Sequence, residues 1–227
     1  MRSALTTTPM EVGCARLGLL IVALAVVGGL VAVSPASGID VKLTMEEARK
    51  ILAAGRGPME TANTPDDVKK VLQQASVATR VGADPVKDPC GVSAILRTKR
   101  YRLEAFGRQE ATESKKQKRE VRMPDEYIQK VIDMPNLEIE VQLCGDDEYF
   151  AEGVQIALQQ GSKTIKPVDV SPPDKGRKNE GNGPAYRSRF TARFAYDNFD
   201  PNVKTKIVII FPDGKLSEFE TDFSKVK

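Results

Sequence analysis

Carboxylates crowd one short stretch of the chain, where Asp146-Asp147-Glu148 is followed by Glu152. Carboxylate oxygens suit a hard cation such as calcium, and two carboxylates facing each other across a cleft could hydrolyse a glycosidic bond. The spacing differs from that of an EF-hand loop, which has acids at alternate positions and a central glycine. A solvated turn after a strand explains the same residues without a site. A carboxylate- or calcium-dependent hydrolase at residues 146–152 is therefore kept as an alternative function, and no cofactor is expected.

The chain of 227 residues contains no histidine and no tryptophan. Without histidine there is no Ser-His-Asp or Cys-His nucleophile pair, no His-ligated zinc, copper or iron site, and no histidine pH switch. No P-loop, GxGxxG, GxSxG or CxxC pattern stands in a supporting context. These exclusions favour a protein that is not an enzyme.

Basic side chains dominate residues 97–122, with ten Lys or Arg against four Asp or Glu. The side chains of this block that could bind a polyanion are Arg97, Lys99, Arg100, Arg102, Lys115, Lys116, Lys118 and Arg119. Such a block could bind a polyanionic envelope polymer or anionic lipid headgroups. Arg187, Arg189 and Arg193 on one face of a later strand could extend it. The net charge of only +3 does not indicate a nucleic-acid-binding protein.

An internal role for the same basic block is the alternative, because an acidic segment follows it. Glu138 and Glu140 alternate with apolar residues in that segment. If Arg100 and Arg102 lie on a neighbouring strand, they could face these two acids. Opposite charges across paired strands contribute roughly 0.2–1 kcal/mol each.

The three cysteines are Cys14, Cys90 and Cys144. Cys14 precedes an apolar run and lacks the small, apolar residues of a lipoprotein signal, so it is set aside with the N-terminal segment. The remaining even pair, in an exported protein, predicts a Cys90–Cys144 disulfide. Closing the loop between residues 90 and 144 reduces the entropy of the unfolded chain, and this stabilises the fold by about 4 kcal/mol. Two separate buried thiols are the alternative.

Residues 1–38 have the pattern of an export signal. Arg2 and Arg16 precede the uncharged run Leu17–Val33, and the small residues Ser34-Pro35-Ala36-Ser37-Gly38 follow it. This order of basic, apolar and small residues is typical of a cleaved signal peptide. The alternative is a retained anchor helix, although a run of this length spans about 25 Å, less than the ~30 Å hydrocarbon core. The sequence therefore predicts an exported protein (periplasmic, cell-surface or secreted), or one anchored in the membrane by a single pass.

Two short helices and a linker are predicted for residues 39–89. Thr44 with Glu47 forms a capping box ahead of an apolar stripe, which we expect to end at Gly55 and Gly57-Pro58. Thr64-Pro65 begins a second helix with a threonine cap and a proline in the first turn. Gly82, Pro85 and Pro89 then break the periodicity, so residues 77–90 read as a linker.

Strand patterns dominate residues 90–227. Alternating apolar residues predict strands at 92–96, 101–105, 137–143, 154–158, 165–170, 186–196, 206–211 and 219–223. A short helix is predicted near 124–132, and the polar stretch 110–120 is expected to be a solvated loop or an exposed helix end. The aromatic face Tyr186, Phe190, Phe194 and Tyr196 is expected to point into a core.

The end of the chain carries a weak resemblance. The segment from Phe199-Asp200-Pro201, through Phe211-Pro212-Asp213-Gly214, to Phe223-Ser224 resembles the closing hairpin of Ig-like β-sandwich modules common in exported bacterial proteins. The resemblance implies a fold and no activity. The predicted fold class is thus α+β, with short N-terminal helices on a mainly antiparallel Ig-like β-sandwich that covers residues 90–227.

The function expected from these features is that of a non-enzymatic binding or structural module of the cell envelope. Its partner would be an unknown envelope protein or a polyanionic polymer, and nucleic acid is not an expected ligand. Contact with the membrane is expected only through residues 1–38, if they are retained. The stretch 108–120 and the loop 171–184 are the expected contact regions, because binding residues concentrate on loops.

Overall fold

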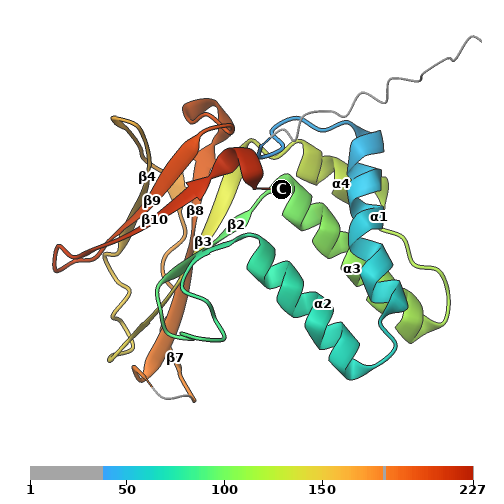
Figure 1. Ribbon diagram of the computed structural model, residues 1–227, viewed down its shortest axis with the longest axis horizontal. Helices are drawn as coiled ribbons and strands as arrows, with labels where there is room; N and C mark the ends of the chain where they lie inside the picture. Colours follow the sequence, from blue (N-terminus) through green and yellow to red (C-terminus); the bar gives the residue numbers. More distant parts are fainter. Residues whose placement is uncertain (1–37, 181–182, 227) are drawn as a thin grey trace, which may run out of the picture. The chain divides into compact units, whose positions relative to one another are not determined.

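Four helices and two open antiparallel sheets make up residues 38–180 and 183–226, the part of the chain that the computed structural model describes (Figure 1). All of these residues belong to one compact unit of the chain. The mixed α+β class agrees with the sequence. The predicted export signal lies outside the described residues, except for Gly38 at its end. No helix in the described part of the chain has the length and apolar character needed to cross a membrane.

The helices are α1 (Met45–Thr61), α2 (Pro65–Ala78), α3 (Lys99–Gln117) and α4 (Asp125–Ile132). Thr44 and Thr64 each cap a helix in a complete capping box, as their spacing predicts. Helix α4 confirms the predicted short helix near 124–132. Helix α1 differs from the prediction, because it continues through Pro58 to Thr61 instead of ending at the glycines.

Helix α3 corrects the prediction of a strand at 101–105, and its exposed end agrees with the second of the two alternatives for 110–120, an exposed helix end. Thr98 caps the helix by accepting a hydrogen bond from the backbone N–H of Tyr101 (3.0 Å). The positions that α3 buries at helical spacing include Leu103, Gly107 and Glu110. A glycine and a glutamate on the buried face conceal the hydrophobic period, which is why the helix could not be recognised from apolar residues alone.

Glycines let α1 and α3 cross closely (Figure 1). A Cβ built at Gly107 would come closer than 3.0 Å to the carbonyl oxygen of Leu52, and one at Gly55 would come as close to the carbonyl oxygen of Glu104. The contact between these helices is therefore backbone against backbone. It closes a small core around Ala48, Leu52 and Leu103, to which α4 contributes Ile128 and Val131.

Replacing Gly107 with alanine is expected to lower the free energy of unfolding by about 1–3 kcal/mol, because the added methyl group must push the two helices apart. Urea denaturation of the purified protein would measure the loss. Gly57→Ala is the matched control, since a Cβ at Gly57 meets nothing within 4 Å. Alanine in a helix is favoured over glycine by about 0.5–1 kcal/mol, so Gly57→Ala should be neutral or stabilising. Equal losses in the two variants would contradict the close crossing.

The first sheet has the strand order β1-β2-β3-β8-β6, and β7 also pairs with β8. Its strands are β1 (Arg80–Gly82), β2 (Ser93–Arg97), β3 (Asn136–Gly145), β6 (Asp169–Val170), β7 (Arg177–Lys178) and β8 (Tyr186–Ala195). The expected linker 77–90 thus contains a short edge strand, β1. Strands β3 and β8 pair along their whole length, from Asn136 with Ala195 to Gly145 with Tyr186.

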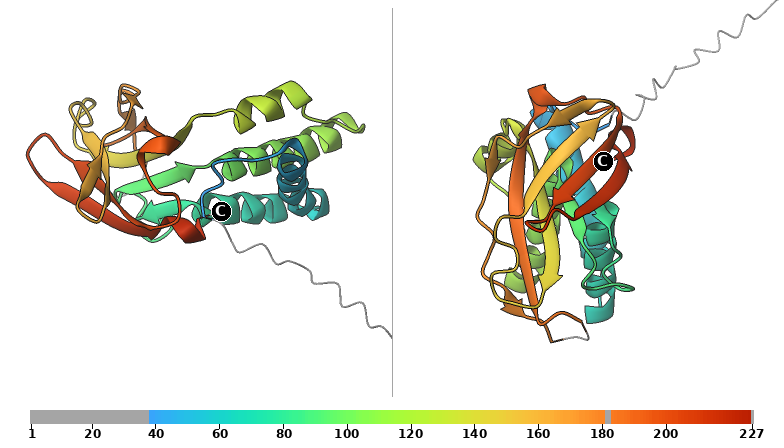
Figure 2. Two further views of the ribbon diagram at one scale, coloured as in Figure 1. Left: turned by 90° about the horizontal axis from the view of Figure 1, so that it is seen from above. Right: turned by 90° about the vertical axis from the view of Figure 1, so that its left-hand side faces the viewer.

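The second sheet has the order β10-β9-β4-β5. Its strands are β4 (Gln155–Gln160), β5 (Lys163–Ile165), β9 (Lys204–Ile210) and β10 (Leu216–Asp222), and 3₁₀ turns occupy Tyr196–Asn198 and Phe223–Lys225. Side chains of both sheets meet in a single core. Figure 2 shows how the strands of the two sheets are arranged. Leu137 and Ile139 of β3 and Ile207 and Ile209 of β9 are fully buried in it.

Strand alternation sorts the residues of β3 and β8 onto two faces of the first sheet. Phe190 and Phe194 point into the core, together with Tyr196 beyond the strand end, as the sequence predicts. Tyr186, the fourth residue of the predicted face, is half-buried and does not belong to the core. The residues between them occupy the outer face. On this face Arg189 lies opposite Gln142, and Arg187 lies opposite Cys144. The outer face is therefore polar and rich in arginine.

Candidate anion-binding site

The structure does not gather the predicted basic block of residues 97–119 into one site. Lys99 is buried at 4% exposure, and its ammonium group donates hydrogen bonds to the carbonyl oxygens of Val41 (2.7 Å) and Ile132. Burial lowers the pKa of Lys99, against the opposing charge of Asp133. Lys115 donates to the carbonyl oxygen of Ala62. These two lysines hold segments of this chain together.

Most arginines of the block form internal ion pairs. Arg97 pairs with Glu140, Arg102 with Glu138, and Arg100 with Asp40 (2.8 Å). The expected pairing of this block with the acidic segment is thus formed in part. It reaches Glu138 from helix α3 instead of from a neighbouring strand, and Arg100 has a different partner.

The remaining cations of the block lie at the exposed end of α3. Within the described ranges Lys116, Lys118 and Arg119 have no acidic partner, although the guanidinium of Arg119 donates to the side chain of Gln117 (2.9 Å). They lie on the last turn of a helix and just beyond it.

The acidic residues Asp146, Asp147, Glu148 and Glu152 lie in the connection from β3 to β4. Asp147 accepts a hydrogen bond from the backbone N–H of Tyr149 (2.7 Å), and Glu148 pairs with Lys175 (2.8 Å). Among residues 38–180 and 183–226, no group of three or more His, Cys, Asp or Glu side chains is placed to hold a metal ion. The bonds that these acids make are those of a turn.

Cys90 and Cys144 lie at disulfide distance, with their Cα atoms 5.3 Å apart, in agreement with the prediction from the cysteine count. The pair ties the loop before β2 to the end of β3. A disulfide is compatible with a location outside the cytoplasm. The disulfide also lies beside the outer face of the first sheet, where Cys144 is opposite Arg187.

Ion pairing separates the described arginines into two groups. Thirteen arginines lie in the described residues, and nine of them form an ion pair with a carboxylate. The four without one, within that part of the chain, are Arg80, Arg119, Arg177 and Arg187. Three of these four line two neighbouring cavities on the outer face of the first sheet.

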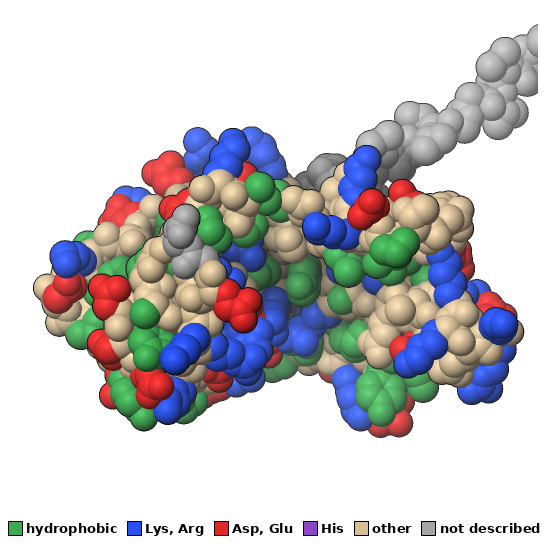
Figure 3. Space-filling view, turned by 90° about the horizontal axis from the view of Figure 1, so that it is seen from below, with side chains coloured by type: hydrophobic (Ala, Val, Ile, Leu, Met, Phe, Trp, Pro, Cys, Tyr) green, Lys and Arg blue, Asp and Glu red, His purple; other side chains and the backbone are tan. Residues whose placement is uncertain are grey.

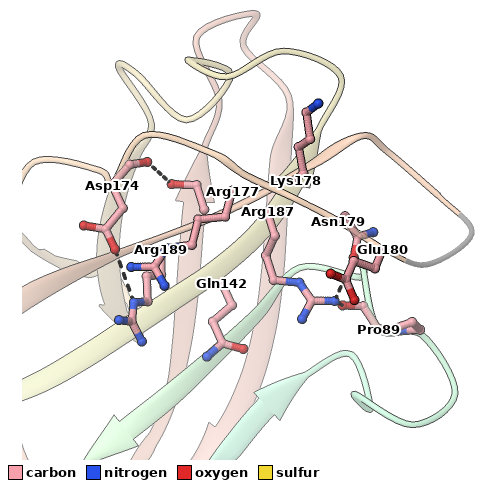
Figure 4. A pocket seen from close by; sticks show the side chains of 10 residues that line it. Pro89, Gln142, Asp174, Arg177, Lys178, Asn179, Glu180, Arg187 and Arg189 are labelled. Atoms are coloured by element: carbon pink, nitrogen blue, oxygen red, sulfur yellow. Dashed lines mark hydrogen bonds and ion pairs between the residues drawn. The ribbon is translucent and has the colours of Figure 1, made fainter.

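The larger cavity has a volume of about 590 Å³ and lies over the ends of β7, β8 and β3 (Figure 4). Its lining residues are Pro89, Gln142, Asp174, Arg177, Lys178, Asn179, Glu180, Arg187, Ser188 and Arg189. Four of these are cations and two are acids, so the lining carries an excess of positive charge. The surface also shows Lys and Arg side chains gathered in a hollow (Figure 3).

The arginines of the larger cavity differ in their ion-pair and hydrogen-bond partners. Arg189 forms an exposed ion pair with Asp174 (3.3 Å), and such pairs contribute little to stability. Arg187 donates from Nη2 to the carbonyl oxygen of Pro89 (3.2 Å) and to Oδ1 of Asn179 (3.4 Å) (Figure 4). Arg177 is exposed and has no partner among the described residues.

The disulfide lines the smaller, adjoining cavity, and the larger cavity comes next to it at Pro89. Pro89 precedes Cys90, and the side chain of Asn179 donates to the sulfur of Cys90 (3.1 Å). Of the two acceptors of Arg187, Pro89 thus adjoins the bridged Cys90 in sequence, and Asn179 is hydrogen-bonded to it. The bridge to β3 holds Pro89 at the border between the two cavities.

The smaller cavity has a volume of about 150 Å³ and shares Pro89, Gln142 and Arg187 with the larger one. Arg80 enters it from β1 and donates from Nη1 to Ser93 (2.5 Å) and Gln142 (3.1 Å). Its Nε atom is buried without a hydrogen-bond partner among the described residues. Burial lowers the pKa of Arg80; the charge of Glu140 opposes this shift, and that of Arg187 adds to it.

Sequence reasoning found part of this site. Arg187 and Arg189 were recognised as a possible extension of the basic block, and Arg177 lies within the predicted contact loop 171–184. Arg80 was missed, because it lies in a segment that was assigned to a linker. The chain matches no known family model, and no curated protein is significantly similar to it.

Proposed function

We propose that this protein is an exported, non-enzymatic module of the cell envelope that binds a polyanionic polymer in the arginine-lined cavities of its first sheet. One observation carries the proposal. Of the four described arginines without an ion pair, three line these two adjoining cavities. Guanidinium groups without a carboxylate partner are available to an anionic ligand, and hydrogen bonds between charged groups are strong. An anion would supply the missing partners.

The size of the larger cavity supports a binding role. About 590 Å³ lies within the range of roughly 300–1,000 Å³ that is usual for ligand sites. Gln142, Arg187 and Arg189 of its lining lie on the paired strands β3 and β8. Side chains that are already placed by a sheet lose less entropy when a ligand binds. The disulfide also supports the proposed export, which would place the site in contact with envelope polymers.

The Ig-like identity of the sheets belongs to the same proposal. Its support is the hairpin of β9 and β10, which turns at Pro212-Asp213-Gly214, and the core that both sheets share.

The carboxylate- or calcium-dependent hydrolase is the weaker alternative, because Glu148 is paired with Lys175 and Asp147 caps its own turn. A membrane-anchored form of the same module would leave the arginine cavities unchanged.

The proposal is tested by measuring the affinity of the protein for dextran sulfate, a general polyanion, by fluorescence anisotropy. Replacing Arg177 and Arg187 together with glutamine is expected to weaken binding at least ten-fold. Hydrogen bonds to charged groups contribute about 1.5–3 kcal/mol, and about 1.4 kcal/mol corresponds to a factor of ten. Binding should also weaken as salt rises, because exposed charges are screened.

Arg119→Gln is the matched control, since it removes the remaining arginine without an ion pair from a position away from the cavities. Its affinity for dextran sulfate should stay within about two-fold of the original protein. If Arg119→Gln weakens binding as much as the cavity variant does, the polyanion recognises overall charge and the proposed site is wrong.

A further inference from the structure

The smaller cavity differs from the rest of the arginine-rich face because two guanidinium groups face it without any ion pair. Arg80 reaches it from the edge strand β1, and Arg187 reaches it from β8, on the other side of β3. Asp88 also lines the cavity but forms an ion pair with neither arginine. Two positive charges therefore share a small space with no carboxylate between them.

The donors that remain around this cavity point to an acceptor-rich ligand. Arg80 has Nε and Nη2 without hydrogen bonds, and Arg187 has Nε and Nη1 without them, among the described residues. The hydroxyl of Ser93 accepts from Arg80 and donates to no described residue. The side-chain oxygen of Gln142 is occupied by Arg80, and its amide nitrogen donates to Glu140 (2.8 Å). Apart from the carboxylate of Asp88, the side-chain groups that remain available are thus donors.

The size of the cavity limits what can enter it. A water molecule occupies about 30 Å³ of liquid, so about 150 Å³ has room for an oxyanion with a few waters. The cavity opens beside the larger one through Pro89, Gln142 and Arg187. A ligand could therefore place one anionic group in the smaller cavity while its chain lies in the larger one.

The two arginines reach the cavity from strands on opposite sides of β3, and this placement favours a tetrahedral anion. A planar carboxylate presents both oxygens to one guanidinium, which satisfies a single bidentate arginine. A phosphoryl group presents its oxygens in more than one direction, so it can accept from Arg80 on one side and Arg187 on the other. We propose that the smaller cavity binds a phosphoryl group between Arg80 and Arg187, so that the polymer of the proposed function is one that carries phosphate.

This proposal rests on the proposed function and narrows its ligand class. Two sources share the chemistry: a phosphomonoester, for which inorganic phosphate is the probe, and a phosphodiester chain, for which poly(glycerol phosphate) is the probe. Polyglutamate of similar length supplies a carboxylate control. Affinities of the intact protein for the three probes would be measured by isothermal titration calorimetry at one salt concentration.

The unchanged protein is expected to bind poly(glycerol phosphate) at least ten-fold more tightly than polyglutamate. Arg80→Gln should remove most of this preference, because it should weaken the binding of poly(glycerol phosphate) at least five-fold more than the binding of polyglutamate. Displacement of the polymer by millimolar inorganic phosphate would indicate that the cavity recognises the group itself; failure to displace would restrict the ligand to a diester chain. Both results agree with a phosphoryl site and differ only in whether it accepts free phosphate or requires a diester chain.

Two outcomes separate this inference from the proposed function. If both polymers bind with equal affinity and Arg80→Gln weakens them equally, the phosphoryl site is wrong and the general polyanion site stands. If neither these polymers nor dextran sulfate bind, the proposed function fails as well. Because Arg80 is half-buried, Arg187→Lys provides a second test at an exposed position. It keeps the charge but loses the planar fork, and should reduce the preference for phosphate.

Discussion

Loss of the Cys90–Cys144 bridge is expected to lower the free energy of unfolding by about 4 kcal/mol. The bridge closes a sequence separation of 54 residues, and the entropy of a loop of that length in the unfolded chain accounts for a loss of this size. Small domains are typically stable by only about 5–15 kcal/mol, so the loss is a large part of the total. The double variant Cys90→Ser with Cys144→Ser should therefore melt far below the original protein.

Urea denaturation with and without a reducing agent would measure this effect. The reducing agent should destabilise the original protein and leave the serine variant unchanged, which separates the bridge from other effects of the reagent. The folded fraction of the serine variant should also bind dextran sulfate more weakly, because both acceptors of Arg187 adjoin Cys90. A denaturation midpoint that does not move on reduction would show that the two sulfurs do not form the bridge in solution.

Glu110→Ala is expected to destabilise the helical part of the protein by about 3 kcal/mol or more. The side chain of Glu110 is 2% exposed, and it pairs with Arg56 (3.1 Å), whose side chain is 10% exposed. The other oxygen of Glu110 accepts from the backbone N–H of Met123. Removing one partner of a buried pair costs about 3–5 kcal/mol, since the other charge is left buried. Glu60 would remain as a half-exposed partner of Arg56.

Glu126→Ala is the control for this variant. Glu126 pairs with Lys130 on an exposed helix face, and pairs of that kind contribute only about 0.3–0.5 kcal/mol. Urea denaturation should thus separate the two variants clearly. Replacing Arg56 with methionine and Glu110 with leucine together should recover part of the loss, because an apolar pair leaves no unpaired charge. If the double variant is less stable than Glu110→Ala, the buried pair is not the cause.

Local patterns predicted the elements whose signals lie within a few neighbouring residues. The capping boxes at Thr44 and Thr64 each require only a side chain three residues further on. The period of two in residues 137–143 and 186–196 reflects a sheet with one buried face. Helix α3 escaped the same reasoning because Gly107 and Glu110 occupy its buried face, and each is there for its contact with α1.

The arginine cavities depend on contacts that no local pattern contains. Arg80 and Arg187 are more than one hundred residues apart in the chain, and the strand order brings them to the two sides of β3. Whether an arginine is free depends on which carboxylates the fold places near it. Arg97 and Arg102 are neutralised by Glu140 and Glu138, whereas Arg187 is left without a carboxylate.

The sequence by itself determined the α+β class, most strand positions, the pairing of the two cysteines left after an export signal is set aside, and the absence of histidine chemistry. Those properties follow from composition and from spacing along the chain. Only the tertiary structure decided which of the many cations are available to a ligand, since electrostatic pairing depends on distance in space. It moved the candidate site from the basic block at residues 97–119 to the outer face of the first sheet, where Arg80, Arg177 and Arg187 surround two adjoining cavities.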